Sequence, residues 1–174
     1  MERIKKNIFL TGAPSSGKTT VIKKVIKGLD RPANGFYTEE ERIGGKRVGF
    51  MMNTLSGETG YLAHQDIISD FHIRRYGVSM ENIETIAVPS ITPHENDIII
   101  LDEIGKMECF SEVFKKAALA ALDSTNIVIG TITFGGGEFI QEVKEREDIE
   151  IVEVTENNRD SLPELILEKA ASQS

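Results

Sequence analysis

The hydrophobic positions of this chain form two kinds of pattern that follow one another. Short unbroken runs of aliphatic and β-branched residues predict buried strands over residues 7–11, 97–102, 126–131 and 149–154. Segments with apolar residues every three or four positions predict helices over residues 20–29, 111–123, 139–147 and 162–171. Strands that alternate with helices are typical of an α/β fold, so we expect a doubly wound, mainly parallel sheet.

A second pattern interrupts this alternation. Short β-favouring pieces cover residues 35–40, 47–54 and 59–63, and the turn-forming runs Gly44-Gly45 and Ser56-Gly57-Glu58 separate them. Pieces so short and so closely spaced leave no room for crossover helices between them. We therefore expect an antiparallel meander added to the parallel sheet.

The remaining segments are less clearly patterned. Residues 31–35 predict a turn, residues 67–76 are ambiguous, and residues 80–88 fit either a short helix or the approach to a strand. Pro89 and Pro93 are expected to break the chain after that segment. Six apolar residues of the helix expected over residues 111–123 are available to face the sheet: Val113, Phe114, Ala117, Leu119, Ala120 and Leu122. No repeat or long linker divides the chain, so we expect one domain over residues 1–174.

A phosphate-loop motif lies between the first expected strand and the first expected helix. The pattern G-x-x-x-x-G-K-[ST] is matched by Gly12, Ala13, Pro14, Ser15, Ser16, Gly17, Lys18 and Thr19. Its two glycines allow backbone N–H groups to point at a phosphate chain, and the helix N-terminus favours the anion. Lys18 is expected to reach the β- and γ-phosphates and the Thr19 hydroxyl to bind Mg²⁺. The sequence therefore predicts nucleotide-phosphate binding.

A second group of polar residues follows the strand expected over residues 97–102. Asp102 ends that strand, where a parallel sheet presents side chains to its ligand, and is the expected second Mg²⁺ ligand. Glu103 follows it and is positioned to orient or deprotonate a water that attacks the γ-phosphate. Thr131 ends the next strand along the chain. It fits either a contact to the γ-phosphate or water, or a simple strand-end role.

Two other classes of phosphate-loop protein share parts of this pattern. Asp102-Glu103-Ile104-Gly105 fits the D-x-x-G switch of signalling GTPases, but the chain has no N-K-x-D run to read guanine, and residues 157–160 lack its lysine. Nucleotide kinases need an acceptor pocket and usually a basic lid, for which four arginines could be recruited: Arg42, Arg47, Arg74 and Arg75. The kinase alternative stays open.

Composition narrows the environment of the protein. The formal net charge of −8 argues against a general nucleic-acid surface, which is usually basic. No apolar run approaches the ~18 residues of a membrane span, and residues 1–6 lead directly into the first strand without room for a signal peptide. The single cysteine, Cys109, cannot form an internal disulfide. We expect a cytoplasmic protein that uses neither a membrane nor nucleic acid.

The run Asp102-Glu103-Ile104-Gly105-Lys106-Met107-Glu108, together with the phosphate loop, resembles the THEP1-type nucleoside-triphosphatases, a family of small phosphate-loop proteins. This D-E-I-G-K-M-E run is far longer than a generic Walker B strand end. Residues 35–40, 47–50, 75–78 and 155–160 also resemble segments of the family. The resemblance thus extends over nearly the whole chain. One departure is Ser15, where the family loop often has glycine, and there we expect altered loop flexibility with binding retained.

The resemblance implies Mg²⁺-dependent hydrolysis of nucleoside 5′-triphosphates to the diphosphate and phosphate, with ATP, GTP, CTP and UTP all accepted. The phosphate loop is expected to wrap the phosphates. The second wall of the nucleotide site is expected to contain Leu101, Asp102, Glu103, Ile104, Gly105, Lys106, Met107 and Glu108.

The residues expected to carry the reaction are Lys18, Glu103 and Lys106. Lys106 either supplies positive charge to the transition state in place of an arginine or forms a surface pair with Glu108 or Glu103. Arg159, in a late polar turn, is a candidate for contact with the base or ribose. Two other functions remain as alternatives, a nucleotide or nucleoside kinase and a slow nucleotide-dependent switch. The sequence identifies no protein partner, since an arginine supplied by another subunit leaves little trace in one chain.

Overall fold

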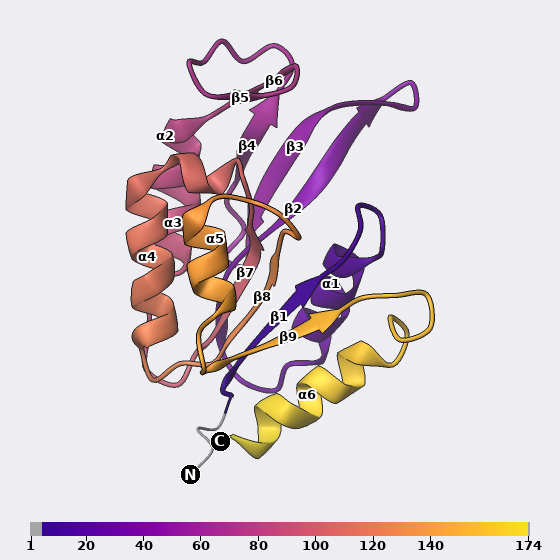
Figure 1. The fold of residues 1–174 in the computed structure, drawn as a ribbon, viewed down its shortest axis with the longest axis vertical. Coiled ribbons are helices and arrows are strands. Elements are labelled where there is room, and N and C mark those ends of the chain that lie inside the picture. Colours follow the sequence, from indigo (N-terminus) through magenta and orange to yellow (C-terminus); the bar gives the residue numbers. More distant parts are fainter. Residues whose placement is uncertain (1–4, 174) are drawn as a thin grey trace.

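A single mixed sheet organises the part of the chain that the structure describes. The structure is a computed structural model of residues 5–173; residues 1–4, in the segment expected to lead into the first strand, and residue 174 lie outside the described residues. The described strands are β1 (Asn7–Thr11), β2 (Ala33–Ile43), β3 (Lys46–Thr54), β4 (Thr59–His64), β5 (His72–Ile73), β6 (Tyr76–Val78), β7 (Ile98–Ile104), β8 (Val128–Ile132) and β9 (Ile149–Glu153). Their order in the sheet is β5-β6-β4-β3-β2-β7-β8-β1-β9 (Figure 1).

Half of this sheet is parallel, as the sequence predicts. Strands β2, β7, β8, β1 and β9 pair in parallel, with Ile8 opposite Ile129 and Ile100 opposite both Gly35 and Ile129. Among these strands, β1, β7 and β8 are almost entirely buried, because helices cover both faces of the sheet. The expected doubly wound α/β fold is confirmed.

The other half of the sheet is the expected antiparallel meander. Strand β3 pairs with β2, β4 with β3, β6 with β4, and β5 with β6, each in antiparallel fashion. The ambiguous segment 67–76 supplies the short strand β5 and the start of β6. β2 is the junction, because it pairs in parallel with β7 and antiparallel with β3.

The turn expected over residues 31–35 is shorter than predicted. β2 already begins at Ala33, which pairs with Ile98, and Gly35 pairs with Ile100. Gly35 has φ 118°, and a Cβ there would lie 1.9 Å from the carbonyl oxygen of Ile100. The glycine that indicated a turn therefore permits a close strand approach instead.

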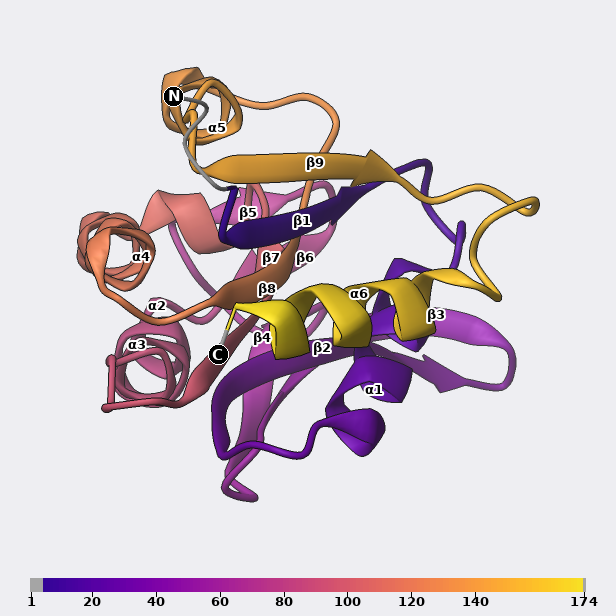
Figure 2. The same cartoon turned by 90° about the horizontal axis from the view of Figure 1, so that it is seen from below.

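Helices lie on both faces of the sheet. They are α1 (Lys18–Gly28), α2 (Met80–Asn82), the π-helical turn η1 (Ile83–Ala87), α3 (Val88–Ser90), the 3₁₀ turn η2 (Glu108–Phe110), α4 (Glu112–Asp123), α5 (Glu138–Lys144) and α6 (Leu162–Ser172). α1 and α6 cover one face, and α3, α4 and α5 cover the other (Figure 2). No helix among the described residues has the length and apolar character needed to cross a bilayer.

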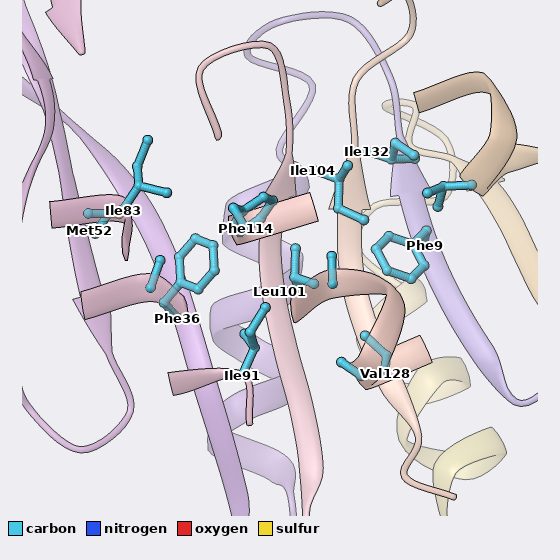
Figure 3. Close-up of a cluster of buried hydrophobic side chains, with 14 of the residues drawn as sticks. Phe9, Phe36, Met52, Ile83, Ile91, Leu101, Ile104, Phe114, Val128 and Ile132 are labelled. Carbon is cyan, nitrogen blue, oxygen red and sulfur yellow. The ribbon is translucent and has the colours of Figure 1, made fainter. Parts of the chain in front are cut away.

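Each face of the sheet buries its own hydrophobic cluster. Phe9, Phe36 and Leu101 face α4 and the 80–91 segment, where they meet Phe114 and Ile83 (Figure 3). On the opposite face, strand residues from β1, β7 and β8 meet α1 and α6, with the buried set including Ile8, Leu10, Val21, Val25, Ile100 and Ile166. The successive residues Ile8 and Phe9 thus enter different clusters, as the two-residue period of a strand requires.

The segment 80–90 is helical throughout, which settles the ambiguity over residues 80–88. Its middle turn is a π-helix in which the Val88 N–H group donates to the Ile83 carbonyl. Pro89 does not break the chain, contrary to expectation: it lies in the short helix α3, directly after the π-helical turn. The helical path ends only beyond Ser90, before Pro93.

The buried face of α4 differs from the predicted one. Phe114 and Leu122 are buried as expected, but Val113 is 48% exposed, and the other buried positions are Ala118 and Ala121. Residues 114, 118, 121 and 122 follow the helical period of 3.6 and define one stripe. Apolar character alone did not separate this stripe from its neighbours, since alanine occurs on both sides of the helix.

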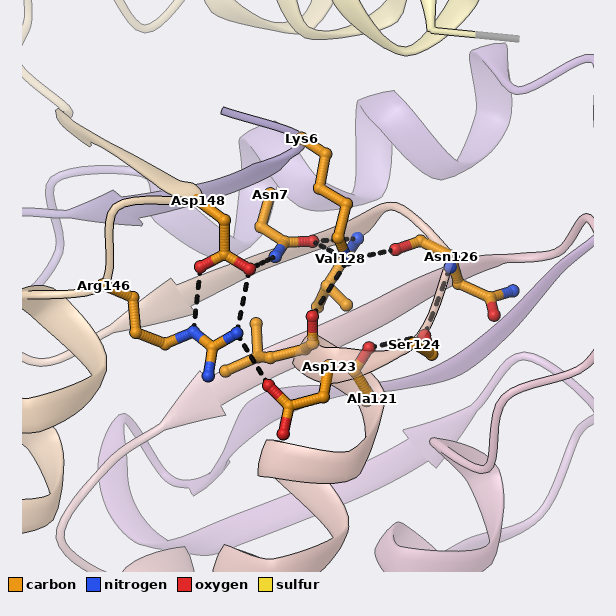
Figure 4. Close-up of polar contacts among 10 residues, drawn as sticks. Lys6, Asn7, Ala121, Asp123, Ser124, Asn126, Val128, Arg146 and Asp148 are labelled. Atoms are coloured by element: carbon orange, nitrogen blue, oxygen red, sulfur yellow. Dashed lines mark hydrogen bonds and ion pairs between the residues drawn. The ribbon is translucent and has the colours of Figure 1, made fainter. Parts of the chain in front are cut away.

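A polar network fixes the amino-terminal ends of the parallel strands. Lys6 Nζ donates to the carbonyl oxygens of Leu122 and Asn126 at 2.9 and 2.8 Å, which holds the start of β1 against the α4–β8 connection (Figure 4). Arg146 donates two hydrogen bonds to Asp148, at 2.9 and 2.8 Å, and pairs with Asp123 at 2.9 Å. These contacts tie together the edge of the sheet opposite the phosphate loop.

Replacing Phe114, in the buried stripe of α4, by a smaller residue should strongly lower the stability of the fold. We expect Phe114→Ala to lower the free energy of unfolding by about 3–5 kcal/mol, since Phe114 is fully buried and contacts Phe36 edge to face at 6.2 Å between ring centroids. The matched control is the neighbouring Val113→Ala, which should change it by less than about 0.5 kcal/mol. Urea denaturation measures both. Equal losses in the two variants would contradict this packing.

Candidate nucleotide site

The phosphate loop follows β1 and leads directly into α1 at the carboxyl edge of the parallel strands (Figure 1). Gly12 has φ 152° and Gly17 has φ 102°, conformations that residues with a Cβ rarely adopt. A Cβ on Gly12 would also lie 2.8 Å from Ser16 Oγ and 3.0 Å from the Val154 carbonyl oxygen. α1 begins at Lys18, two residues earlier than predicted, so its first free N–H groups lie beside the loop.

Lys18 and Thr19 occupy the first turn of α1 and point to different parts of the site. Lys18 Nζ donates to the Gly12 carbonyl oxygen at 2.8 Å and to that of Ala13 at 3.4 Å, so the ammonium group lies over the loop. The Thr19 hydroxyl donates to Asp102 Oδ2 at 2.9 Å. The two halves of the predicted site, 83 residues apart in the sequence, are therefore in direct contact.

Asp102 lies at the centre of the site and is fully buried. The Thr131 hydroxyl donates to its Oδ1 at 2.5 Å, and the Thr38 N–H group donates to its Oδ2 at 3.5 Å. Burial raises the pKa of Asp102, and the hydrogen bonds from Thr131 and Thr19 oppose that shift. The side chain of Thr131 thus orients Asp102. This role lies between the two alternatives left open by the sequence, a contact to the γ-phosphate or water and a simple strand-end role.

Two glutamates lie next to this aspartate. Burial and the charge of Asp102 raise the pKa of Glu103 to about 7, while Lys18 lowers it. Glu108, at the start of η2, is also buried, and its burial together with the charge of Glu103 raises its pKa well above the ordinary value. Gly105 separates the two: a Cβ there would lie 2.7 Å from Glu103 Oε1 and 2.8 Å from Glu108 Oε2. A side chain at this position would displace one of the carboxyl groups.

These residues line a cleft of about 680 Å³. Of the predicted site residues, those in its lining are Gly12, Pro14, Ser15, Ser16, Gly17, Lys18, Thr19, Asp102, Glu103, Lys106, Met107 and Glu108. Leu101 and Ile104 point into the core and, with Ala13 and Gly105, are not part of the lining. The cleft also contains residues that sequence reasoning did not assign to the nucleotide site: Lys23, Thr38, Glu39, Glu40, Arg47, Phe50, Leu62, Ile73, Thr133 and Phe134. Most of these come from the meander, and no local motif marks them.

Lys106 is exposed and lies in the cleft lining beside Glu103. Among the described residues it forms no ion pair with Glu108 or Glu103, which was the alternative reading of this lysine. Its ammonium group is therefore available to a ligand in the cleft.

Arg159 lies on the other side of the phosphate loop. It lines a second cavity of about 250 Å³ together with Ser15, Gly17, Thr20, Val21, Lys24 and Asp160. Its Cδ lies 3.5 Å from the position of a Cβ on Gly17. The polar turn that carries Arg159 is held by Asn158, which accepts from the Thr155 N–H group at 2.8 Å and donates to the Glu153 carbonyl at 2.8 Å.

Ser15 has φ 63°, in the left-handed region. This conformation gives a physical reason for the glycine that the related loops often carry at this position. The departure from glycine thus places a side chain in a strained backbone conformation.

The donor set fits Mg²⁺. The Thr19 hydroxyl and the Asp102 carboxylate are hard oxygen donors within 2.9 Å of each other, next to a loop that presents N–H groups to phosphates. Mg²⁺ in such sites takes one or two protein ligands and completes its shell with phosphate oxygens and water. Residues 5–173 contain no group of three or more His, Cys, Asp or Glu side chains arranged to hold a metal ion.

A phosphate loop between β1 and α1, with a buried aspartate in the carboxyl-terminal half of β7 in contact with its threonine, defines the class of phosphate-loop NTPases. A family model described as NTPase matches residues 7–167. The nucleoside-triphosphatase THEP1 of Thermotoga maritima is 44% identical over 162 residues, which cover 92% of each chain. The chain therefore belongs to the THEP1-type family of nucleoside-triphosphatases.

Solved structures agree with this assignment. The crystal structure of THEP1 from Aquifex aeolicus superimposes with a TM-score of 0.85 at 32% identity and covers 93% of this chain and 97% of that one. The solution structure of a human cancer-related nucleoside triphosphatase gives a TM-score of 0.79 at 34% identity and covers 97% and 98%. The resemblance inferred from the motifs is confirmed, and it extends to the meander.

Replacing Ser15 by glycine should stabilise the protein. A side chain in the left-handed region costs about 1–2 kcal/mol, and the extra freedom of glycine in the unfolded chain offsets about half of that. We expect Ser15→Gly to raise the free energy of unfolding by about 0.5–1 kcal/mol. Ser15→Ala keeps the Cβ and should give no gain. Urea denaturation of both variants measures the difference, and a gain in the alanine variant would contradict the strain.

Removing the buried carboxyl of Glu108 should flatten the pH dependence of stability. The raised pKa values mean that native Glu103 and Glu108 hold protons that the unfolded chain releases near pH 4.5. Their contribution to stability is thus full below that pH and is lost as the pH rises through the raised pKa values, which is about 7 for Glu103. The free energy of unfolding of the wild type should fall between about pH 5 and about pH 8. In Glu108→Gln this fall should be smaller by about 1–2 kcal/mol.

The control for this experiment is Glu112→Gln, because the Glu112 side chain is 77% exposed on the neighbouring helix α4. That variant should follow the wild-type pH profile. If Glu108→Gln followed it as well, the carboxyl group of Glu108 would not be a site of proton uptake in the folded protein.

Proposed function

We propose that this protein hydrolyses nucleoside 5′-triphosphates to the diphosphate and phosphate in a Mg²⁺-dependent reaction with little preference among ATP, GTP, CTP and UTP. The observation that carries the proposal is the contact between Thr19 and Asp102, beside Lys18 and Glu103. It unites the phosphate loop, two ligands for Mg²⁺ and a carboxyl group with a pKa near neutrality. The names of the family relatives support the same activity.

In the proposed mechanism the loop N–H groups and Lys18 bind the β- and γ-phosphates and offset the negative charge that develops on them. Thr19 and Asp102 would hold Mg²⁺, which would supply electrostatic stabilisation to the negative charge of the phosphates. Thr131 and Thr38 keep Asp102 in the orientation that this requires. Lys106 adds positive charge from the open side of the cleft.

Glu103 orients the attacking water and accepts its proton. The water oxygen forms a bond to the γ-phosphorus, and the bond from that phosphorus to the β,γ-bridging oxygen breaks, which releases the diphosphate. A carboxyl group with a pKa of about 7 suits this role, because general bases work best near the operating pH.

The broad base tolerance is assigned to the second cavity beside the phosphate loop. A guanidinium group such as that of Arg159 stacks on any nucleobase, because every base has a π-face. Stacking of that kind anchors the nucleoside without reading its hydrogen-bonding edge. A cytoplasmic location and independence from nucleic acid belong to the same proposal and are based on the lone cysteine and the net charge of −8.

The test measures phosphate release from each of the four nucleoside triphosphates with Mg²⁺ and with a chelator. We expect Mg²⁺-dependent release from all four in the wild type. Glu103→Gln should lose at least about 100-fold in rate while its affinity for the Mg²⁺–nucleotide changes little, because it removes a proton acceptor but no phosphate ligand. Lys18→Ala should weaken both binding and release.

Glu112→Gln, on the surface of α4, is the matched control and should retain the wild-type rate. Normal hydrolysis by Glu103→Gln would rule out the water-orienting role of this residue. Nucleotide binding without phosphate release from the wild type would contradict the proposed function itself and favour a nucleotide-dependent switch.

A further inference from the structure

The cleft is larger than its phosphate-binding end, and a second wall closes it on the side of the meander. We call the group Glu40, Arg47, Phe50, Leu62 and Ile73 the meander wall; it comes from β2, β3, β4 and β5. None of these residues belongs to the phosphate loop or to the run 101–108. Their function is therefore not explained by phosphate binding or by the coordination of Mg²⁺.

The course of the nucleotide leaves this wall free. The inference rests on the proposed function, in which the nucleoside leaves the phosphate loop past Thr20 toward the Arg159 cavity. The γ-phosphate then lies at the opposite end of the triphosphate, near Glu103 and Lys106. The meander wall belongs to the same cleft as Glu103 and Lys106 but not to the Arg159 cavity, so it faces the reacting end of the nucleotide.

The wall is built rigidly around Arg47. Its Nε donates to the Tyr76 hydroxyl at 3.1 Å, and its Nη1 donates to Glu40 Oε1 at 3.0 Å. The guanidinium also lies over the rings of Phe50 and Tyr76, at 5.1 and 5.4 Å from their centroids. Arg75 supports the same tyrosine hydroxyl at 3.1 Å. Hydrogen bonds and packing of this kind hold a side chain in one geometry, as a ligand-binding group requires.

The chemistry of the wall favours a neutral ligand that carries hydroxyl groups. Burial tends to raise the pKa of Glu40, but hydrogen bonds from Arg47 and Arg42 outweigh it and hold the carboxyl ionised. Its two oxygens accept three N–H bonds, from Arg47 Nη1, Arg42 Nε and Arg42 Nη2, and a carboxylate has about four lone-pair sites. One site thus remains for a hydroxyl donor.

The remaining wall residues are apolar. Phe50, Ile73 and Met107 contribute partly exposed apolar side chains to the lining, whereas Leu62 is 3% exposed, and apolar surface of this kind suits a planar ring. Within the lining, Arg47 is paired with Glu40 and Lys23 with Glu39, so the charges of these four side chains cancel and an anionic ligand would gain little from them. A nucleoside, with ribose hydroxyls and an uncharged ring, combines the two features that the wall recognises.

We propose that the meander wall binds a nucleoside as a second substrate, which accepts the γ-phosphoryl group in place of water. A hydroxyl oxygen of the nucleoside forms the bond to the γ-phosphorus, the bond to the β,γ-bridging oxygen breaks, and Glu103 accepts the hydroxyl proton. The products are a nucleoside monophosphate and the nucleoside diphosphate of the donor. Hydrolysis is then the reaction that the same site performs when water occupies the acceptor position.

The experiment supplies the wild-type protein with Mg²⁺ and γ-labelled ATP, alone and with adenosine, guanosine, cytidine or uridine. Labelled monophosphate and labelled phosphate are separated and quantified. We expect at least one nucleoside to take up label, with the ratio of monophosphate to phosphate rising with its concentration to saturation. Label in phosphate alone, with every nucleoside, would overturn the inference but leave the proposed hydrolysis intact. Absence of both products would overturn both.

Substitutions in the meander wall test whether the acceptor binds there. Phe50→Ala should lower the ratio of monophosphate to phosphate at least about tenfold, because it removes the ring contact. Ile73→Ala serves as a second variant on the short strand β5, in case loss of the Phe50 ring unfolds the meander. Glu40→Gln should raise the nucleoside concentration needed for half-saturation. The control is Ile68→Ala, since Ile68 is fully exposed outside the cleft.

Two outcomes would locate the acceptor elsewhere. An unchanged ratio in folded Phe50→Ala and Ile73→Ala would exclude the meander wall as its binding site. Transfer to nucleoside monophosphates in preference to nucleosides would contradict the neutral ligand deduced from Glu40 and Arg47.

Discussion

The structure depends on one buried carboxylate, Asp102, and on the hydroxyl groups that hold it. A carboxyl group without solvent at the end of a central strand is costly, and the bonds from Thr19 and Thr131 offset part of that cost. Each bond joins β7 to a different element: Thr19 links it to the first turn of α1, and Thr131 links it to β8. The same three-way contact aligns the phosphate loop with the strand that carries Glu103. Fold and site therefore share an interaction that a purely apolar strand end could not provide.

The low polarity around Asp102 also sets the chemistry of its neighbours. Glu103 and Glu108 lie close to it on the segment that leads from β7 into η2, and the burial that they share raises the pKa of both. Gly105 makes this clustering possible, because any side chain there would meet both carboxyl groups. The D-E-I-G-K-M-E run is thus a compact unit: each acidic residue in it acts on the others through charge, and the glycine supplies the space.

The antiparallel meander extends the site away from the phosphate loop. A purely parallel sheet would end at β2, and the cleft would be open on that side. Strands β3, β4, β6 and β5 continue the sheet, and β3 and β4 bring Arg47, Phe50 and Leu62 into the lining of the same cleft as the phosphate loop. The comparison structures cover 93% and 97% of this chain, meander included. The meander thus belongs to the common fold, and the cleft that it closes is a feature of the architecture.

The sequence by itself determined the elements whose reasons are local. Glycine spacing specified the phosphate loop, unbroken apolar runs specified β1, β7 and β8, and the run from Asp102 to Glu108 identified the family. Tertiary structure alone decided what depends on contacts between distant segments. The role of Thr38, the cluster around Gly105 and the lining by Phe50 carry no local signal, and the position of Thr131 at a strand end did not indicate its bond to Asp102. The buried face of α4 and the helical course through Pro89 were likewise decided by packing. Local conformation is set by neighbours in the chain, whereas burial, charge coupling and the shape of a cleft are set by neighbours in space.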